Sequence, residues 1–278
     1  CCLKGAPVAP RRARLRRQEG RACGAVKNLV SSPHSAHSED LMINLVKRPV
    51  IDLQKDVQVA VKAANLYGQK ARVVFVIDKS GSMEEVYLNG QVQCVMDRAV
   101  SMALEFDDDG KAEVYAFHNR AFALREVGVQ NLSTYIRDEV LSIPWGGTEY
   151  APVMQKIVEK YKSGTGDGGG GMLSGLFGKK PQKMPTYVIF VTDGDNSDHA
   201  EAERVIREAS GYPIFWKFVG IGRAAFTFLK RLDTMAGRKV DNANFFAFFG
   251  SIPDGELYNG LLEEYPKWLK DAKAASIL

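Results

Sequence analysis

The sequence predicts an α/β protein with an open, doubly wound, mostly parallel sheet and one antiparallel hairpin at the sheet edge. From about residue 52 onward, segments with the periodicity of amphipathic helices alternate with short apolar segments that have the length of strands. This alternation is typical of a parallel sheet with helices on both faces. Two of the apolar segments, 71–77 and 186–192, end directly before an aspartate. Ligands of such sheets bind beyond the carboxyl ends of the strands, so we expect a site there.

Each element follows from its hydrophobic pattern. The segment 72–77 is apolar on both faces, as a central parallel strand should be. From Val92 the apolar positions recur at helical spacing. Two short strands flank Asn119 and Arg120 and predict a tight hairpin. The expected order is helix 52–66, strand 72–77, a helix from 92 to about 106, hairpin strands 113–118 and 121–127, helices 131–140 and 151–162, strand 186–192, helix 200–209, strand 213–222, helix 224–236, strand 244–250 and helix 255–272.

The amino-terminal segment differs in composition from the rest of the chain. Residues 1–41 show no hydrophobic periodicity and hold eight basic residues against three acidic ones, which leaves 29 of the 37 basic and 30 of the 33 acidic residues for the remainder. We predict that 1–41 is a disordered basic tail or an upstream remnant, and that 42–70 is a lead-in segment with a short helix. One domain is expected over 71–278, with a glycine-rich flexible insertion at 163–183.

Composition also argues against several classes of protein. The near-neutral charge outside the tail argues against nucleic-acid binding by the folded domain. No apolar run approaches the roughly 20 residues that a membrane-spanning helix needs. Cys94 is the one cysteine outside the tail, so we expect neither a disulfide framework nor a cysteine-based zinc site. This cysteine usage predicts a cytoplasmic protein.

Hydroxyl and carboxylate side chains gather where the predicted strands end. Asp78, Ser80 and Ser82 follow the first strand at alternate positions, and Asp193 follows the strand at 186–192. Thr148 comes after two glycines in a third loop. This set offers oxygen atoms and neither nitrogen nor sulfur. Oxygen-only sets suit Mg²⁺, and also Mn²⁺ or Ca²⁺, so we predict a divalent-metal site.

These motifs resemble the metal-ion-dependent adhesion site of von Willebrand factor A domains. The segments "ARVVFVIDKSGSM", "GGTEYAPV" and "VIFVTDG" are similar to the A-type domain of the tellurium-resistance-associated, TerF-like bacterial proteins. The resemblance covers roughly 70–272 and implies a Rossmann-like von Willebrand factor A fold for the domain. It further implies that Ser80, Ser82 and Thr148 bind Mg²⁺ directly, while Asp78 and Asp193 act mainly through water.

The resemblance implies a metal-dependent protein-binding module in a bacterial stress-response or tellurium-resistance complex. Another protein would supply an acidic residue to the metal. The alternative is a metal-dependent phosphohydrolase on a similar sheet, with Asp78 as nucleophile. Such an enzyme usually carries a second carboxylate two residues later, where this chain has Ser80. No histidine, lysine or cysteine is placed by motif as a base, so we predict that the protein is not an enzyme.

Several neighbouring residues have more than one interpretation. Asp195 and Asp198 are expected to be solvated loop acids or an N-cap of the helix near residue 200. Lys79 and the Trp145 loop are expected to form the rim of the site. Trp145 is either exposed near the metal or packed in the core. The phenylalanine-rich segment at 244–250 is expected to be a buried strand.

Overall fold

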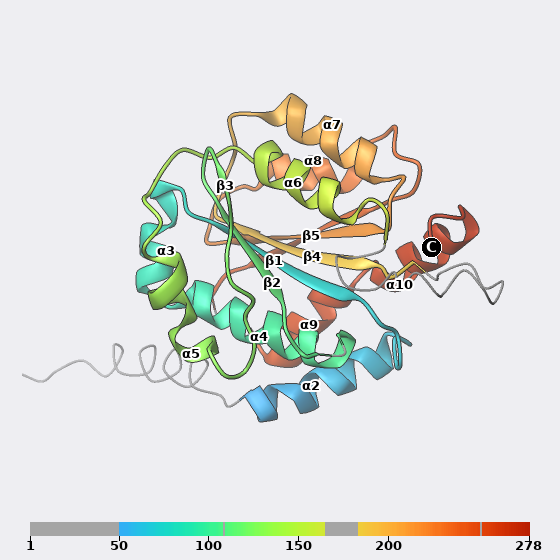
Figure 1. Ribbon diagram of the computed structural model, residues 1–278, viewed down its shortest axis with the longest axis horizontal. Helices are drawn as coiled ribbons and strands as arrows, with labels where there is room; N and C mark the ends of the chain where they lie inside the picture. Colours follow the sequence, from blue (N-terminus) through green and yellow to red (C-terminus); the bar gives the residue numbers. More distant parts are fainter. Residues whose placement is uncertain (1–49, 108, 165–182, 251) are drawn as a thin grey trace, which may run out of the picture.

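The computed structural model describes residues 50–107, 109–164, 183–250 and 252–278 (Figure 1). It contains a six-stranded sheet of order β3-β2-β1-β4-β5-β6. Neighbouring strands are parallel except for β2 and β3, which form the antiparallel edge hairpin. The predicted fold class is therefore confirmed. The strands are β1 Arg72–Asp78, β2 Glu113–Phe117, β3 Ala121–Ala123, β4 Thr186–Thr192, β5 Ile214–Ile221 and β6 Ala243–Phe248.

Helices cover both faces of this sheet, which gives three layers (Figure 1). One face carries α2 (Val50–Ala63), α4 (Gln91–Phe106) and α9 (Asp254–Leu262). The opposite face carries α6 (Ala151–Tyr161), α7 (His199–Ala209) and α8 (Thr227–Thr234). The remaining helices are α3 Glu84–Leu88, α5 Leu132–Tyr135 and α10 Tyr265–Ala274, with a 3-10 turn at Gly81–Met83 and a π-helical turn at Ile136–Val140.

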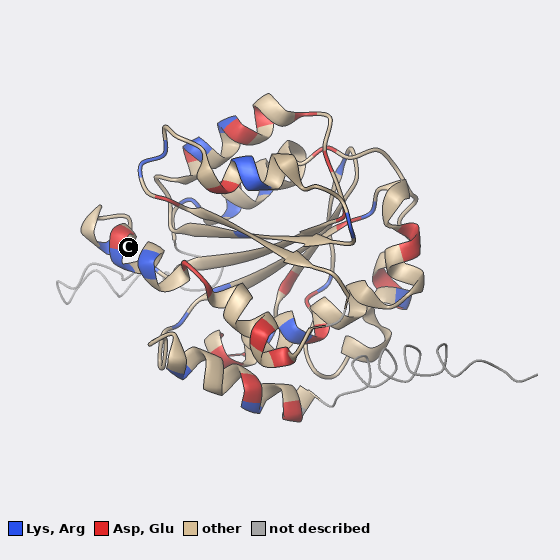
Figure 2. Ribbon diagram, turned by 180° about the vertical axis from the view of Figure 1, so that it is seen from behind, with Lys and Arg blue, Asp and Glu red and all other residues tan. Residues whose placement is uncertain are grey.

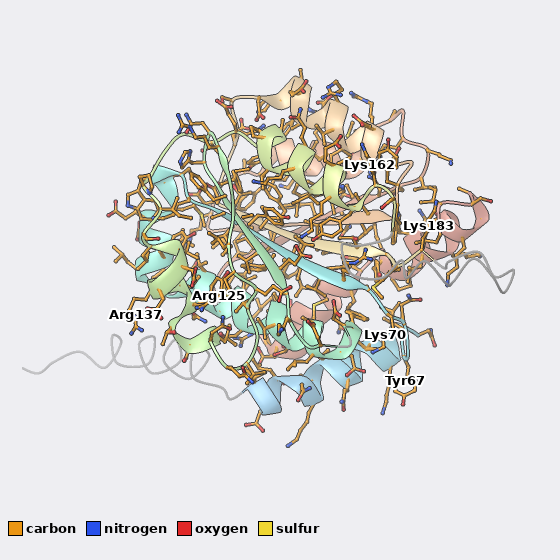
Figure 3. All side chains as sticks on the ribbon, viewed as in Figure 1. Tyr67, Lys70, Arg125, Arg137, Lys162 and Lys183 are labelled. Carbon is orange, nitrogen blue, oxygen red and sulfur yellow. The ribbon has the colours of Figure 1, made fainter. Side chains whose placement is uncertain are left out.

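The apolar core lies in two layers, one on each side of the sheet. In β1, Phe75 and Ile77 are buried in one layer, and Val74 and Val76 in the other. Burial on both faces explains why this strand reads as a continuous apolar run. Side chains crowd between the sheet and its helices, whereas the labelled Tyr67 lies at the outside (Figure 3). Charged residues of both signs are interspersed over the helices and loops (Figure 2).

Two terminal elements differ from the prediction. The helix expected at 255–272 is two helices, because Glu264 adopts a left-handed conformation with φ 64° between α9 and α10. Pro266 lies in the first turn of α10, where a missing N–H is tolerated. The segment 244–250 is only partly a buried strand: Phe248 is 1% exposed, but Phe249 lies beyond the end of β6 and is 63% exposed.

Other differences concern short elements. The hairpin strand β3 has three residues instead of the seven expected, and Val127 makes only an isolated bridge with Ala112. Helix α3 was not expected, because its five residues are too few to show a helical period. The tail at 1–41 and most of the predicted insertion at 163–183 lie outside the described residues. Within the described ranges, no helix combines the length and apolar character needed to cross a membrane.

Helix α2 of the lead-in segment is part of the core. Its residues Val57, Ala60 and Val61 are buried in the same apolar layer as α4 and α9. Figure 1 shows α2 lying along this face of the sheet assembly. The apolar stripe of α2 is therefore expected to stabilise the domain by removing apolar surface from water.

We expect Val57→Ala to lower the free energy of unfolding by about 2 kcal/mol, because it removes two fully buried methyl groups. Val59 in the same helix is 68% exposed. The matched change Val59→Ala should alter stability by less than about 0.5 kcal/mol. Urea unfolding of both variants measures the difference. Equal effects would mean that α2 does not unfold together with the sheet.

Candidate metal centre

The candidate site lies where the two central strands end. Strands β1 and β4 are adjacent and parallel, with Ile77 opposite Val191. This register brings Asp78, the last residue of β1, beside Thr192, the last residue of β4. The loops that follow both strands therefore leave the same edge of the sheet, as the sequence predicts.

Asp78 is fully buried and its carboxylate is held from two sides. One oxygen, Oδ1, accepts a hydrogen bond of 2.7 Å from the backbone N–H of Ser80. The other, Oδ2, accepts one of 2.6 Å from the hydroxyl of Thr192. Burial raises the pKa of Asp78 from 3.8 to about 6, although both hydrogen bonds oppose this rise. The position of the carboxylate is thus set by the first loop and by the end of β4.

A chain of hydroxyl and carboxylate groups continues from this point. The Oγ atoms of Ser80 and Ser82 lie 3.1 Å apart. The hydroxyl of Ser82 donates a hydrogen bond of 3.0 Å to Oδ1 of Asp193. Burial also raises the pKa of Asp193. Four of the five predicted residues therefore form one connected cluster.

Thr148 joins this cluster through its loop. The N–H of Gly81 donates to the carbonyl of Gly146 at 3.1 Å, and the N–H of Gly146 donates to the carbonyl of Lys79 at 3.3 Å. A Cβ atom at Gly146 would lie 2.6 Å from the ring of His118, so this close approach requires glycine. Thr148 lies two residues further on and is half-buried; among the described residues its hydroxyl makes no hydrogen bond with the other four.

The loop that carries Thr148 is also hydrogen-bonded to the loop after β4. The carbonyl of Thr148 accepts hydrogen bonds from the N–H of Ser197 at 2.9 Å and from its hydroxyl at 3.2 Å. The carboxylate of Asp198 accepts hydrogen bonds from the N–H groups of Tyr150 at 2.9 Å and Ala151 at 2.7 Å. The three loops thus form one hydrogen-bonded unit around the site.

Comparison with known proteins places the chain in a family. The family described as "vWA found in TerF C terminus" matches residues 70–170 and 171–278. The chain belongs to this TerF-like von Willebrand factor A family. The protein YcbR of Bacillus subtilis (strain 168), described as uncharacterized, is 35% identical over 235 residues, which cover 82% of this chain and 90% of YcbR.

Solved structures include distant likenesses. Proximal thread matrix protein 1 from the mussel byssus is 16% identical, with a TM-score of 0.49 over 71% of this chain and 48% of that protein. The chain thus spans about half the length of the mussel protein. Manganese-loaded TRAP protein of Plasmodium vivax is 14% identical, with a TM-score of 0.47 over 71% of this chain and 74% of that chain.

The donor set of this TerF-like domain suits a hard divalent cation. In an octahedral Mg²⁺ shell with bonds of about 2.1 Å, neighbouring ligand oxygens lie about 3 Å apart. The separation of 3.1 Å between the Ser80 and Ser82 oxygens is close to this spacing. A cation would also offset the repulsion by which Asp193 helps to raise the pKa of Asp78. Within the described ranges, and at this site too, no group of three or more His, Cys, Asp or Glu residues could hold a metal, so the candidate site depends on its hydroxyl oxygens.

Asp198 has a role that the sequence prediction missed. It occupies the N-cap position of α7, which is one of its two expected roles, but its side chain makes no capping hydrogen bond to that helix. Instead it holds the first N–H groups of α6, the helix that follows the Thr148 loop. A carboxylate at a helix amino terminus is favoured by the helix dipole. Asp195 is exposed and its Oδ1 lies 2.5 Å from Nε2 of His199.

Three buried or half-buried residues also support the site. Thr192 contacts Asp78, and Tyr150 places its hydroxyl 3.1 Å from that of Thr192. Tyr87 donates a hydrogen bond of 2.9 Å to the backbone carbonyl of Asp78. Thr192 directly precedes Asp193 in the sequence, so its place in the site could have been predicted from that of Asp193. The two tyrosines come from other elements, and no local pattern marks them.

The predicted rim is only partly correct. Trp145 is 38% exposed, as expected for a rim residue. Lys79 is instead 1% exposed, and its Nζ lies 2.8 Å from the ring centroid of Trp145. Burial lowers the pKa of Lys79 to about 8. Its ammonium therefore lies beneath the indole and not on the surface.

The raised pKa of Asp78 predicts a pH-dependent stability in the absence of metal. Below about pH 4 the carboxyl is protonated in the folded and the unfolded chain. Between about pH 4 and 6 the carboxyl of the unfolded chain ionises first, so the contribution of Asp78 to the free energy of unfolding falls as the pH rises, by about 3 kcal/mol. In EDTA, Asp78→Asn should therefore be more stable than the parent protein at pH 7, and this advantage should disappear toward pH 4.

Urea unfolding across this pH range measures the effect. Asp195→Asn, at an exposed position in the loop after β4, is the control and should change stability by less than about 0.5 kcal/mol. An Asp78→Asn protein that is less stable than the parent at every pH would show that the ionised carboxylate stabilises the fold by itself.

Proposed function

We propose that this protein is a metal-dependent protein-binding module and not an enzyme. Its site would hold Mg²⁺, or alternatively Mn²⁺ or Ca²⁺, and would dock an acidic side chain of another protein. The observation that carries this proposal is the connected cluster Asp78–Ser80–Ser82–Asp193 at the carboxyl ends of β1 and β4. Membership of the TerF-like von Willebrand factor A family supports the same conclusion.

The chemistry of the donors explains why an acidic partner is expected. Ser80, Ser82 and Thr148 offer neutral hydroxyl oxygens as direct ligands. Asp78 and Asp193 would act mainly through water, so their charges would be only partly used. When bound, the ion supplies a largely uncompensated positive charge and an open coordination position, to which a carboxylate of the partner can bind. The partly exposed Trp145 would add an apolar contact at the rim.

The phosphohydrolase alternative is disfavoured by the surroundings of Asp78. A nucleophilic carboxylate needs an oxygen that a substrate can approach. Asp78 is 0% exposed, and each of its oxygens already accepts a hydrogen bond. The position of the second carboxylate of such enzymes is taken by Ser80. A binding role therefore fits the site better than covalent catalysis.

The proposed setting is a bacterial stress-response or tellurium-resistance complex in the cytoplasm. The family likeness supports the first part of this proposal. The single cysteine outside the tail, Cys94, is buried and free, which is compatible with a reducing compartment.

We expect millimolar MgCl₂ to raise the melting temperature by mass action, because the metal binds the folded chain only. Asp78→Ala and Thr148→Ala should abolish this rise without unfolding the protein. Thr234→Ala, an exposed threonine at the end of α8, is the matched control and should behave like the parent. Calorimetry with MgCl₂ and EDTA checks both statements.

The same variants test partner binding. Bacterial proteins retained by the immobilised parent in MgCl₂ should be released by EDTA and absent with Asp78→Ala and Thr148→Ala. Retention that survives chelation and both substitutions would place the interface elsewhere. Phosphatase turnover that is lost in the same two variants would support the enzyme alternative.

A further inference from the structure

Lys79 is a buried cation in the loop that follows β1 and carries the candidate ligands Ser80 and Ser82. It lies between Asp78 and Ser80, and its side chain is almost completely inaccessible. Among the described residues no carboxylate forms a salt bridge with it. Its Nζ lies 2.8 Å from the ring centroid of Trp145 and 5.3 Å from that of Tyr87. The ammonium is therefore stabilised by the faces of two aromatic rings and by the charge of Glu84.

Both aromatic rings connect to the site. Trp145 directly precedes Gly146, whose backbone pairs with Lys79 and Gly81. Tyr87 packs edge-on against Trp145 with ring centroids 5.5 Å apart, and its hydroxyl binds the carbonyl of Asp78. The cation–aromatic cluster thus lies at the junction of the first loop, helix α3 and the loop that carries Thr148.

The loop that carries Thr148 is held by Ser197 and Asp198 on its carboxyl-terminal side, so an anchor is needed on the amino-terminal side. Gly146 and Gly147 stand between Trp145 and Thr148, and glycines leave the backbone free to adopt many conformations. Gly147 has no atom within 4 Å of the position of a Cβ atom, so no neighbouring side chain restrains it there. Two backbone hydrogen bonds at Gly146 and the Lys79–Trp145 contact hold the amino-terminal side of this segment.

We propose that Lys79 is a positioning residue, which clamps Trp145 so that the glycine-containing loop presents Thr148 to the metal. This inference rests on the proposed function of the site. Lys79 is the residue between Asp78 and Ser80 in Asp-x-Ser-x-Ser, and its proposed role is to position the loop, not to bind the metal. Lys79 would act through Trp145 and would not touch the metal.

The direction in which Lys79→Met changes the Mg²⁺ affinity distinguishes a positioning role from simple charge repulsion. A positive charge close to the site repels a divalent cation, so its removal alone would tighten Mg²⁺ binding. Loss of the clamp would instead weaken binding, because Thr148 would then be held only from its carboxyl-terminal side, through Ser197. We expect Lys79→Met to weaken Mg²⁺ binding about tenfold, the order of one desolvated cation–π contact. Lys79→Arg keeps the charge and the ability to stack on an indole, so it should retain most of the affinity.

The experiment measures Mg²⁺ affinity by titration calorimetry for the parent, Lys79→Met, Trp145→Leu and the double variant. If the two residues act as one unit, the double variant should lose no more than either single one. Lys230→Met, which removes an exposed lysine on α8, is the matched control and should bind like the parent. Thermal unfolding in EDTA shows whether each variant folds.

A second readout needs no metal. The chain has three tryptophans, and subtraction of the Trp145→Phe spectrum isolates the emission of Trp145. In EDTA, acrylamide should quench this emission more strongly in Lys79→Met than in the parent and in Lys79→Arg. Unchanged quenching, or equal or tighter Mg²⁺ binding by folded Lys79→Met, would overturn the inference. A parent protein that binds no Mg²⁺ would instead refute the proposed function itself.

Discussion

The site depends on one buried interaction, the contact of the Asp78 carboxylate with the Ser80 N–H and the Thr192 hydroxyl. It turns the chain sharply after β1 and joins the ends of the two central strands. Because the same turn leads to Ser82, it also sets the direction in which the serine hydroxyls face. The cluster that reaches Asp193 follows from this arrangement. Truncation of the Asp78 side chain would therefore disturb the loop geometry as well as remove a charge.

This arrangement carries a cost in stability that function would explain. Burial raises the pKa of Asp78 to about 6, so the ionised form is disfavoured in the folded chain at neutral pH. Lys79, next to it, is a buried cation whose pKa is lowered to about 8. Two buried charges at one sheet edge contradict the ordinary preference for an apolar interior. Such local conflicts are expected at functional sites, where a ligand supplies the missing compensation.

The surrounding structure holds the three loops in fixed relation to one another. Asp198 joins the loop after β4 to the start of α6, and the Gly146 backbone joins the first and third loops. These links leave Ser82 exposed and Thr148 and Asp193 half-buried, while Asp78 and Ser80 are covered. The candidate site is thus held by buried residues and remains accessible at the protein surface. This accessibility suits a site that binds another protein.

The sequence by itself determined the fold class, the succession of strands and helices along the chain and the four residues that form the connected cluster. It could do so because strand and helix periodicities are local, and because residues that follow parallel strands must meet at one sheet edge. Only the tertiary structure decided the burial of Lys79 beneath Trp145, the attachment of Asp198 to α6 and the break between α9 and α10. The first two depend on contacts between segments far apart in the sequence, and the third on a single left-handed residue, Glu264. None of these three features leaves a periodic pattern that a reader of the chain could find.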